Sequence, residues 1–425
     1  MAREWSSPGG SRGQAAVDGE QELSSKVRIV AAIWLWMLVN YLDRVAISFA
    51  GPAIMKSLSL SPASFGIVLS SFGIGYLLSQ IPGGLIADRW GAKLVLVVGP
   101  VFWALFTGLT GLVSTVAAFV VIRALFGISE GLSVPALHRL VGDRFEPRER
   151  ARAFAIGLSA LAVAPAAAGP FVGQLVTAFG WQMMFFLMMG PALLAAVASQ
   201  LLIPAAGPRH GVVDAGKATR DGSFRAVLGE RSFWLMAGSY CCYNIAFWGY
   251  LGWMPSYLAL AHNIDLKAAG PLAGIPYLFA FVGLLFWGWL GTGPFHHRRP
   301  QLITCSLLLA GASLFIAYRA DNLDQSVAGL SAAAFFLYGC QGSLGAVILD
   351  LAPAALRGTY VGVVSTAGQI GGLMAPAIVG ALVSATGSFS AGFTFMTIAL
   401  CISAVAMFTL SPFVAATRKF AHGAT

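Results

Sequence analysis

Charged residues are scarce in this chain. They make up 10% of the 425 residues, whereas a typical soluble protein carries about 25%. So little charge cannot cover a water-facing surface, and the composition therefore excludes an ordinary soluble domain. Hydrophobic residues make up 57%, and apolar stretches long enough to cross a bilayer recur along the chain. The sequence predicts an all-α membrane protein.

Several functional signals are missing as well. The five cysteines lack metal-ligand spacing and fall within expected helices, so we expect neither a metal site nor disulfides. The N-terminal segment lacks the apolar core of a signal peptide. No nucleophile elbow, zinc-ligand cluster or intramembrane protease motif occurs, so the sequence does not predict an enzyme.

The apolar stretches predict twelve membrane-spanning helices. They cover residues 27–49, 62–87, 93–113, 116–140, 151–176, 181–203, 233–259, 270–291, 300–318, 325–349, 358–384 and 390–413. The longest polar interruption divides them into six and six. We expect a disordered cytoplasmic tail (1–26), a six-helix bundle (27–203), a cytoplasmic linker (204–232), a second bundle (233–413) and a cytoplasmic tail (414–425).

Basic residues are distributed unevenly between the expected loops. Lys56, Lys267 and Arg319 are the only ones on one side of the membrane, while most of the 26 lie on the other. This asymmetry places both termini in the cytoplasm. The net charge of +9 is thus a topology signal spread over short loops, and nucleic-acid binding is not expected.

The two halves repeat one another. A Gly–Pro–Gly–Gly series at 157, 170, 173 and 180 recurs at 362, 376, 380 and 387. Helices 5 and 11 therefore occupy equivalent places in two halves of the same hand. Parallel repeats of this kind place a binding site between the halves, near the middle of the membrane.

Four charged residues lie inside expected helices: Asp43, Arg44, Arg123 and Glu130. A charge near the bilayer centre costs roughly 2.5–3.5 kcal/mol on insertion scales. Arg123 and Glu130 are seven residues apart, two helical turns, so they share one face. One interpretation is that the four form buried ion pairs that lock helices together, although such pairs often gain little stability. The alternative is a site for an anion and a proton.

The segment GGLIADRWGAKLVL carries a specific motif. With Gly84, Asp88, Arg89, Gly91 and Lys93 in place, it resembles the signature of the major facilitator superfamily. The resemblance implies a latch on the cytoplasmic face, with Asp88 near the N-terminus of helix 11. The corresponding segment in the second half is degenerate, so we assign the latch to the first half only.

Within that superfamily the chain resembles the anion:cation symporter family. The likeness runs over residues 27–413 and is strongest in NYLDR, SQIPGGLIADRWGAK, RALFGISEG and GWMPSYL. It implies that Asp43 and Glu130 bind protons, and that Arg44 binds the substrate carboxylate. It also implies that Arg123 pairs with Glu130 and helps to couple transport. The cavity tyrosines of the family correspond to Tyr41 and Tyr76.

The chain departs from the sugar-acid carriers of that family at three places. Leu161 stands where they have a glutamine, Ser365 where they commonly carry asparagine, and Leu137-His138 where they have Asn-Asn. Each change removes an amide that could pair with a substrate hydroxyl, and an unpaired buried hydroxyl costs roughly 1–3 kcal/mol. A less hydroxylated organic acid is the expected substrate.

The second half has no ionisable residue deep in an expected helix, so its contribution should be shape and neutral hydrogen bonding. Packing is the commoner role for each of its polar candidates: Tyr240, Tyr243, Asn244, Trp248, Tyr338, Gln341 and Gln369. Among them Asn244 and Gln341, together with Ser365, are our predicted substrate contacts.

Together these features predict a proton-coupled symporter that takes up a small organic anion by alternating access. Movement of an arginine toward or away from a carboxyl group would control whether that group holds a proton. Protons are the coupling ion, and no other cofactor is expected. We expect a monomer in a bacterial inner membrane. A proton-coupled drug or metabolite antiporter is the alternative, because AAAGPFVGQ partly resembles the helix 5 motif of antiporters.

Overall fold

The computed structural model describes residues 9–204, 224–353 and 357–423, and within these ranges it contains helices and no strands. The helices are α1 (Gly9–Ser57), α2 (Pro62–Trp90), α3 (Ala92–Thr110), α4 (Val116–Gly131), α5 (Ser133–Arg144), α6 (Pro147–Leu202), α7 (Phe224–Gly229), α8 (Arg231–Ala261), α9 (Leu266–Thr292), the short 3₁₀ helix η2 (His296–Arg298), α10 (Arg299–Arg319), α11 (Leu323–Gly339), α12 (Gln341–Leu351), α13 (Arg357–Thr386) and α14 (Phe389–Gly423).

Ten helical stretches in the described ranges are long and apolar enough to cross a membrane. One of them, Ala153–Leu202, contains two of the expected helices. Helix α8 is not among the ten because Ser, Tyr and Asn interrupt its apolar character, yet it is packed between α13, α14 and α1. Dividing α6 and adding α8 gives the twelve spans of the sequence prediction.

The division of α6 lies at Gly180, whose φ of 81° and ψ of 162° are not helical. Gly387, its counterpart in the repeat, has a φ of 68° between α13 and α14. A side chain at either position would strain the backbone, because positive φ favours glycine. Another irregularity also recurs: helix 4 is interrupted at Leu132, between α4 and α5, and helix 10 at Cys340, between α11 and α12. The same local geometry thus appears in both halves.

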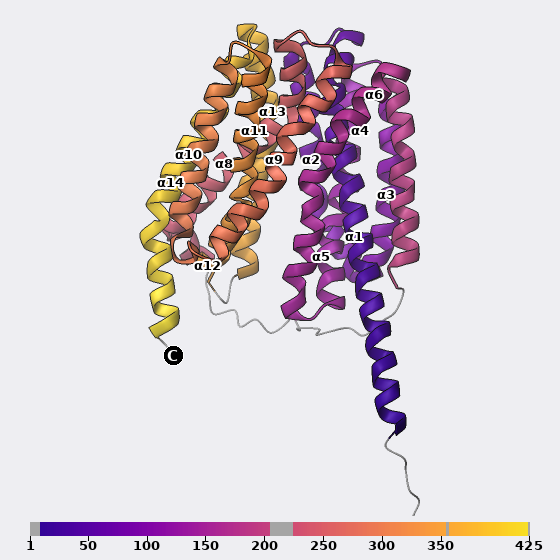
Figure 1. Cartoon of the computed structure of the whole chain (residues 1–425), viewed down its shortest axis with the longest axis vertical. Coiled ribbons are helices and arrows are strands. Elements are labelled where there is room, and N and C mark those ends of the chain that lie inside the picture. Colours follow the sequence, from indigo (N-terminus) through magenta and orange to yellow (C-terminus); the bar gives the residue numbers. More distant parts are fainter. Residues whose placement is uncertain (1–8, 205–223, 354–356, 424–425) are drawn as a thin grey trace, which may run out of the picture.

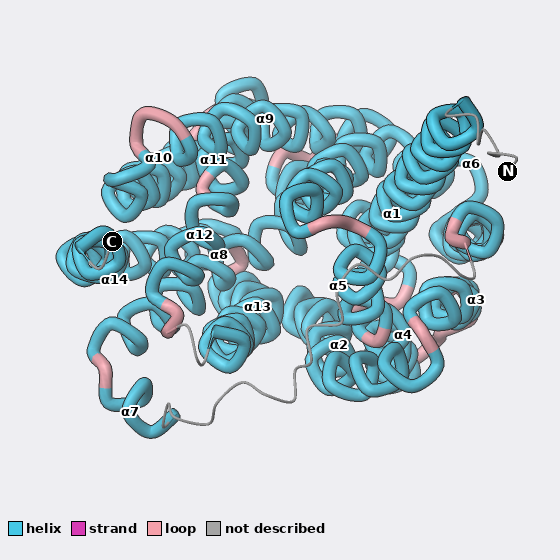
Figure 2. Tube along the Cα trace, turned by 90° about the horizontal axis from the view of Figure 1, so that it is seen from below, coloured by secondary structure: helices cyan, strands magenta, loops and turns pink. Residues whose placement is uncertain are grey.

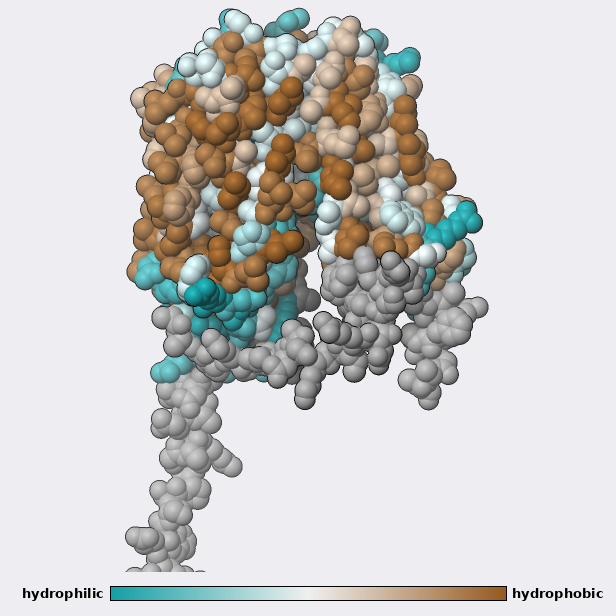
Figure 3. Space-filling model, turned by 180° about the vertical axis from the view of Figure 1, so that it is seen from behind, coloured by the Kyte–Doolittle hydropathy of each residue, from teal (hydrophilic) through white to brown (hydrophobic). Residues whose placement is uncertain are grey.

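The helices form two groups with a space between them. Seen from below, α1–α6 lie on one side and α8–α14 on the other (Figure 2). In Figure 1 the ends of α5, α12 and α14 point to the lower end of the molecule, as does the start of α1. A space-filling view shows a broad hydrophobic belt with hydrophilic residues above and below it, and the face is hollowed between the halves in its lower part (Figure 3).

The upper ends of the two groups meet. Ser256 Oγ of α8 donates a hydrogen bond to Ser48 O of α1 at 3.1 Å, and the rings of Phe65 and Trp253 pack edge to face at 5.7 Å. Helices α6 and α9 touch through Gly169 and Gly270, where a Cβ on either residue would collide with the other's carbonyl group. The molecule is therefore closed above and open below.

Both termini differ from the sequence expectation. Residues 9–26, expected to be a disordered tail, continue α1 as helix, and α14 extends to Gly423. An ion pair one helical turn apart stabilises the first extension, because Lys26 lies 2.8 Å from Glu22. Lys26 also contacts Glu149 of α6 at 3.0 Å. Most of the expected linker 204–232 lies outside the described residues.

Candidate functional site

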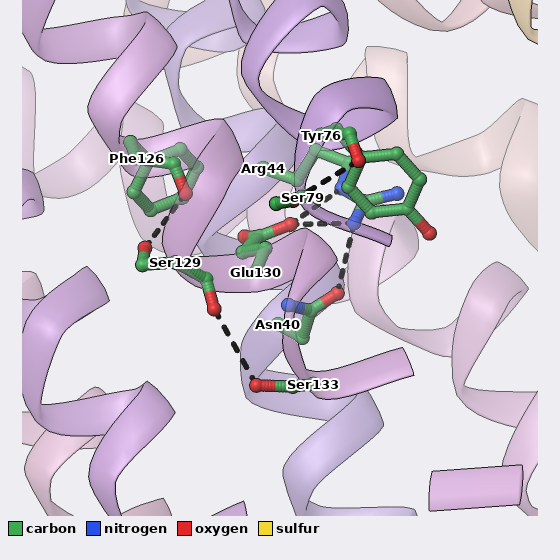
Figure 4. Close-up of polar contacts among 8 residues, drawn as sticks. All are labelled: Asn40, Arg44, Tyr76, Ser79, Phe126, Ser129, Glu130 and Ser133. Atoms are coloured by element: carbon green, nitrogen blue, oxygen red, sulfur yellow. Dashed lines mark hydrogen bonds and ion pairs between the residues drawn. The ribbon is translucent and has the colours of Figure 1, made fainter. Parts of the chain in front are cut away.

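A buried ion pair joins α1 to α4 in the first half. The Nε and Nη2 atoms of Arg44 both donate to Glu130 Oε2, at 3.0 and 2.5 Å. Arg44 Nη2 also donates to Asn40 Oδ1 at 3.2 Å, one turn earlier on α1 (Figure 4). Glu130 is fully buried, and Arg44 is 6% exposed. Hydrogen bonds between two charged groups in such a setting are strong and directional.

Aromatic rings surround the Arg44 guanidinium. Its central carbon lies between 4.8 and 5.6 Å from the centroids of four rings: Tyr41, Phe72, Tyr76 and Trp248. The first three belong to α1 and α2, whereas Trp248 belongs to α8 of the second half. Cation–π attraction holds the guanidinium in this position without neutralising its charge.

Among the described residues Arg123 makes no hydrogen bond with Glu130, although the two charges attract each other. Glu130 is bound by Arg44 instead, and the Arg123 guanidinium lies over the rings of Phe126 and Phe72, at 4.6 and 5.4 Å. Its Nε atom is buried without a hydrogen-bond partner among the residues that the structure describes. Spacing along α4 could show that Arg123 and Glu130 share a face, but it could not show that an arginine from α1 reaches the carboxylate first.

Asp43 is the fourth member of the cluster, and it is 1% exposed. Neither of its carboxylate oxygens has a hydrogen-bond partner in the described part of the chain. Arg123 attracts it electrostatically without a direct bond, whereas Glu130 repels it. A buried carboxyl group without partners is costly in its charged form. A bound proton would neutralise Asp43 and remove that cost.

A cavity of about 460 Å³ lies between the halves, with residues of both in its lining. Five of the predicted site residues line it: Tyr41, Arg44, Tyr76, Asn244 and Gln341. Asp43, Arg123 and Glu130 lie behind this wall and are buried. Ser365, the remaining predicted substrate contact, is half-buried on α13 and is not part of the lining in this conformation.

Sequence reasoning missed two kinds of site residue. Asn40 bonds to Arg44, and its position four residues earlier on the same helix was a usable signal. Apolar residues of the lining, such as Phe281 and Leu284 of α9, gave no signal, because an apolar residue in a membrane helix faces lipid, protein or cavity with the same local pattern.

The acid of the latch motif forms an ion pair within its own half. Asp88 pairs with Arg139 of α5; the residues just before helix 11, its expected neighbour, lie outside the described part of the chain. Lys93 donates to Gln200 O at 2.8 Å, the Arg89 guanidinium lies over the Trp90 ring, and Gly91 has a φ of 89°. Gly84 is on the same stretch of α2.

Comparisons with known proteins agree with this architecture. The chain is 30% identical to the hexuronate transporter of Bacillus subtilis over 87% of its length and 90% of the relative. It is 31% identical to a probable sulfoacetate transporter of Cupriavidus necator (92% and 95%). It is 32% identical to a probable galactarate/D-glucarate transporter of Escherichia coli (87% and 90%).

Solved structures share the fold at lower identity. A bacterial homologue of the human lysosomal transporter Spinster, in an inward-facing and unoccupied conformation, has a TM-score of 0.75 at 19% identity, covering 93% of this chain and 97% of that one. A D-xylose–proton symporter has a TM-score of 0.71 at 14% identity, covering 90% and 97%. The Major Facilitator Superfamily model matches residues 33–376 and 276–424. The chain belongs to the major facilitator superfamily and is a membrane transporter, not an enzyme.

Proposed function

We propose that this protein is a proton-coupled symporter of a small organic anion. The observation that carries the proposal is the buried Arg44–Glu130 pair, whose arginine borders the cavity while its acid lies behind it. An anion that enters the cavity competes with Glu130 for the same guanidinium. If the substrate takes Arg44, Glu130 loses its counter-charge and is best stabilised by a proton.

The names of the relatives fit an anionic substrate. Hexuronate, galactarate, glucarate and sulfoacetate are all small organic acids. Export of cationic drugs, the alternative from the sequence, fits less well, because a positive guanidinium at the cavity wall repels a cation.

In the proposed cycle Arg44 binds the substrate carboxylate through its planar fork. Asp43 and Glu130 hold the protons, and Arg123 lies close enough to Asp43 to act on its charge. Tyr41, Tyr76, Asn244 and Gln341 shape the cavity, and Ser365 would reach the substrate only after the halves move. The Gly84–Lys93 segment would latch the lower ends when they close.

We further propose that the open lower end faces the cytoplasm of a bacterial cell, with both termini on that side, and that the monomer is the working unit. The expected cytoplasmic loops are the basic ones, as the positive-inside rule requires. Reporter fusions at each terminus would test the orientation, because a periplasmic reporter active at either end would contradict it.

Uptake into proteoliposomes tests the function. The protein is reconstituted, an inward proton gradient is imposed, and accumulation is followed across a panel of labelled mono- and dicarboxylates and sulfonates. At least one acid should accumulate above its external concentration, and a proton uncoupler should abolish the accumulation. Accumulation that resists the uncoupler would contradict proton coupling, and no uptake of any acid would contradict the substrate class.

A further inference from the structure

The cavity holds one charge. Arg44 is the single charged side chain among the described residues that line it. Arg123 is 3% exposed and faces aromatic rings behind the wall. A substrate with two carboxylates would therefore find one cationic partner, and its second carboxylate would be buried unpaired once the halves close over it.

Most of the remaining wall is apolar. The first half contributes Leu158 and Leu161 of α6, and the second contributes Phe281 and Leu284 of α9 and the ring of Phe247. Opposite Arg44 lies Trp248, whose ring centroid is 5.6 Å from the guanidinium carbon. A molecule whose carboxylate is bound by Arg44 can place its next atoms beside this ring, which also lines the cavity.

Several polar groups of the lining are already committed within the protein. Tyr243 Oη donates to Leu337 O at 3.0 Å, and Asn244 Nδ2 donates to Tyr240 O at 2.8 Å. Ser159 Oγ donates to Ile156 O at 2.7 Å. A polyhydroxy acid would find these groups already bonded, and each of its hydroxyl groups left unsatisfied would weaken binding.

We infer that the substrate is a monocarboxylate with an apolar, flat body, such as an arylalkanoate, held by Arg44 at one end and stacked on Trp248 along its length. This inference rests on the proposed function, because it assigns the substrate of the same site. It differs from the hydroxylated acids named for the relatives. Burial of an aromatic body against tryptophan and leucine supplies the affinity that hydroxyl contacts supply elsewhere.

Binding to the purified full-length protein in detergent tests the inference, with thermal stabilisation as the readout. Phenylacetate is compared with glucuronate, which has the same charge and many hydroxyl groups, and with glucarate, which has two carboxylates. The alcohol 2-phenylethanol has the aromatic body without the charge. Phenylacetate should bind at least about tenfold more tightly than each of the other three.

Two cavity substitutions should move the preference in a defined direction. Trp248→Ala should weaken phenylacetate about tenfold while leaving glucuronate nearly unchanged, and Trp248→Phe should restore most of the loss. Leu161→Gln places an amide in the wall and should strengthen glucuronate relative to phenylacetate. Trp234→Ala is the matched control, because Trp234 is on the same helix and is 60% exposed on the outer surface.

The outcomes separate this inference from the proposed function. Glucuronate or glucarate binding as tightly as phenylacetate would overturn the inference and leave an anion symporter in place. Equal binding of 2-phenylethanol would show partitioning into apolar surface and would also overturn it. If no acid in the wider uptake panel binds or is transported, the proposed function fails together with the inference.

Discussion

The two halves of this transporter follow one helical plan but bury different chemistry. The first half encloses Asp43, Arg44, Arg123 and Glu130, each at most 6% exposed. Among the described residues of the second half, the buried polar side chains are neutral, such as Asn244, serines and the hydroxyl groups of tyrosines. Among the described residues, deeply buried charge is thus confined to the first half. A repeat can preserve helical geometry while its two copies bury different side chains.

The largest expected effect tests the charged half. Arg44→Lys keeps the positive charge but loses the planar fork that bonds to Glu130 through two nitrogen atoms. Affinity for a transported acid should fall on the order of a hundredfold, the loss expected when one partner of a buried charge network is changed. Affinity is measured on the purified protein. Arg319→Lys, outside the site, is the control, and wild-type affinity in Arg44→Lys would make Arg44 structural only.

Proton coupling can be separated from binding at Glu130. Glu130→Gln imitates a permanently protonated side chain of the same size. Net accumulation driven by a pH gradient should fall to background, because the empty carrier can no longer release this proton. Exchange between two loaded sides should survive, since it requires no proton release.

Counterflow and accumulation are compared in the same proteoliposomes, with Asp321→Asn, at an exposed position, as the matched control. Normal accumulation with a normal pH dependence in Glu130→Gln would remove Glu130 from the proton pathway. Coupling would then have to be sought outside the charged half.

The contact between the halves gives a third test. Gly169 and Gly270 touch through their backbones at the upper end, so Gly169→Leu should force α6 and α9 apart there. Spin labels at positions 56 and 267, on a cysteine-free background, should report a longer distance, and uptake should fall about tenfold. Gly190→Leu, on the second span of α6, is the control, because a Cβ there meets nothing within 4 Å.

The smallest effect is expected in the second half. Asp350 lies 3.3 Å from Arg299 at the lower end, and its side chain is 26% exposed. Asp350→Asn should change the free energy of unfolding by less than about 1 kcal/mol, as for other partly exposed pairs, and uptake should change less than about twofold. A loss of uptake in Asp350→Asn as large as that in Glu130→Gln would show that charged residues of both halves are needed for transport.

Much of the fold could be predicted, because membrane-spanning helices are recognisable in a sequence from the length and apolar composition of their segments. The latch motif and the glycine–proline repeat added the family and the plan of two halves. The partner of Glu130 could not be predicted, because the pair joins residues 44 and 130 on different helices. Only the packing of these helices determines which arginine contacts the Glu130 carboxylate. The pair of Asp88 with Arg139 could not be predicted for the same reason, because it also joins residues on different helices.

The ring of aromatic side chains around Arg44 has a consequence for inhibitors. A guanidinium enclosed by four rings offers few places for water, so an anion must shed much of its hydration shell to reach it. Inorganic anions should then compete in the order of the Hofmeister series, with weakly hydrated thiocyanate and perchlorate ahead of chloride, and strongly hydrated sulfate last. The inhibitory strength of an anion would then follow the ease with which it loses its hydration shell, and its charge alone would not predict that strength.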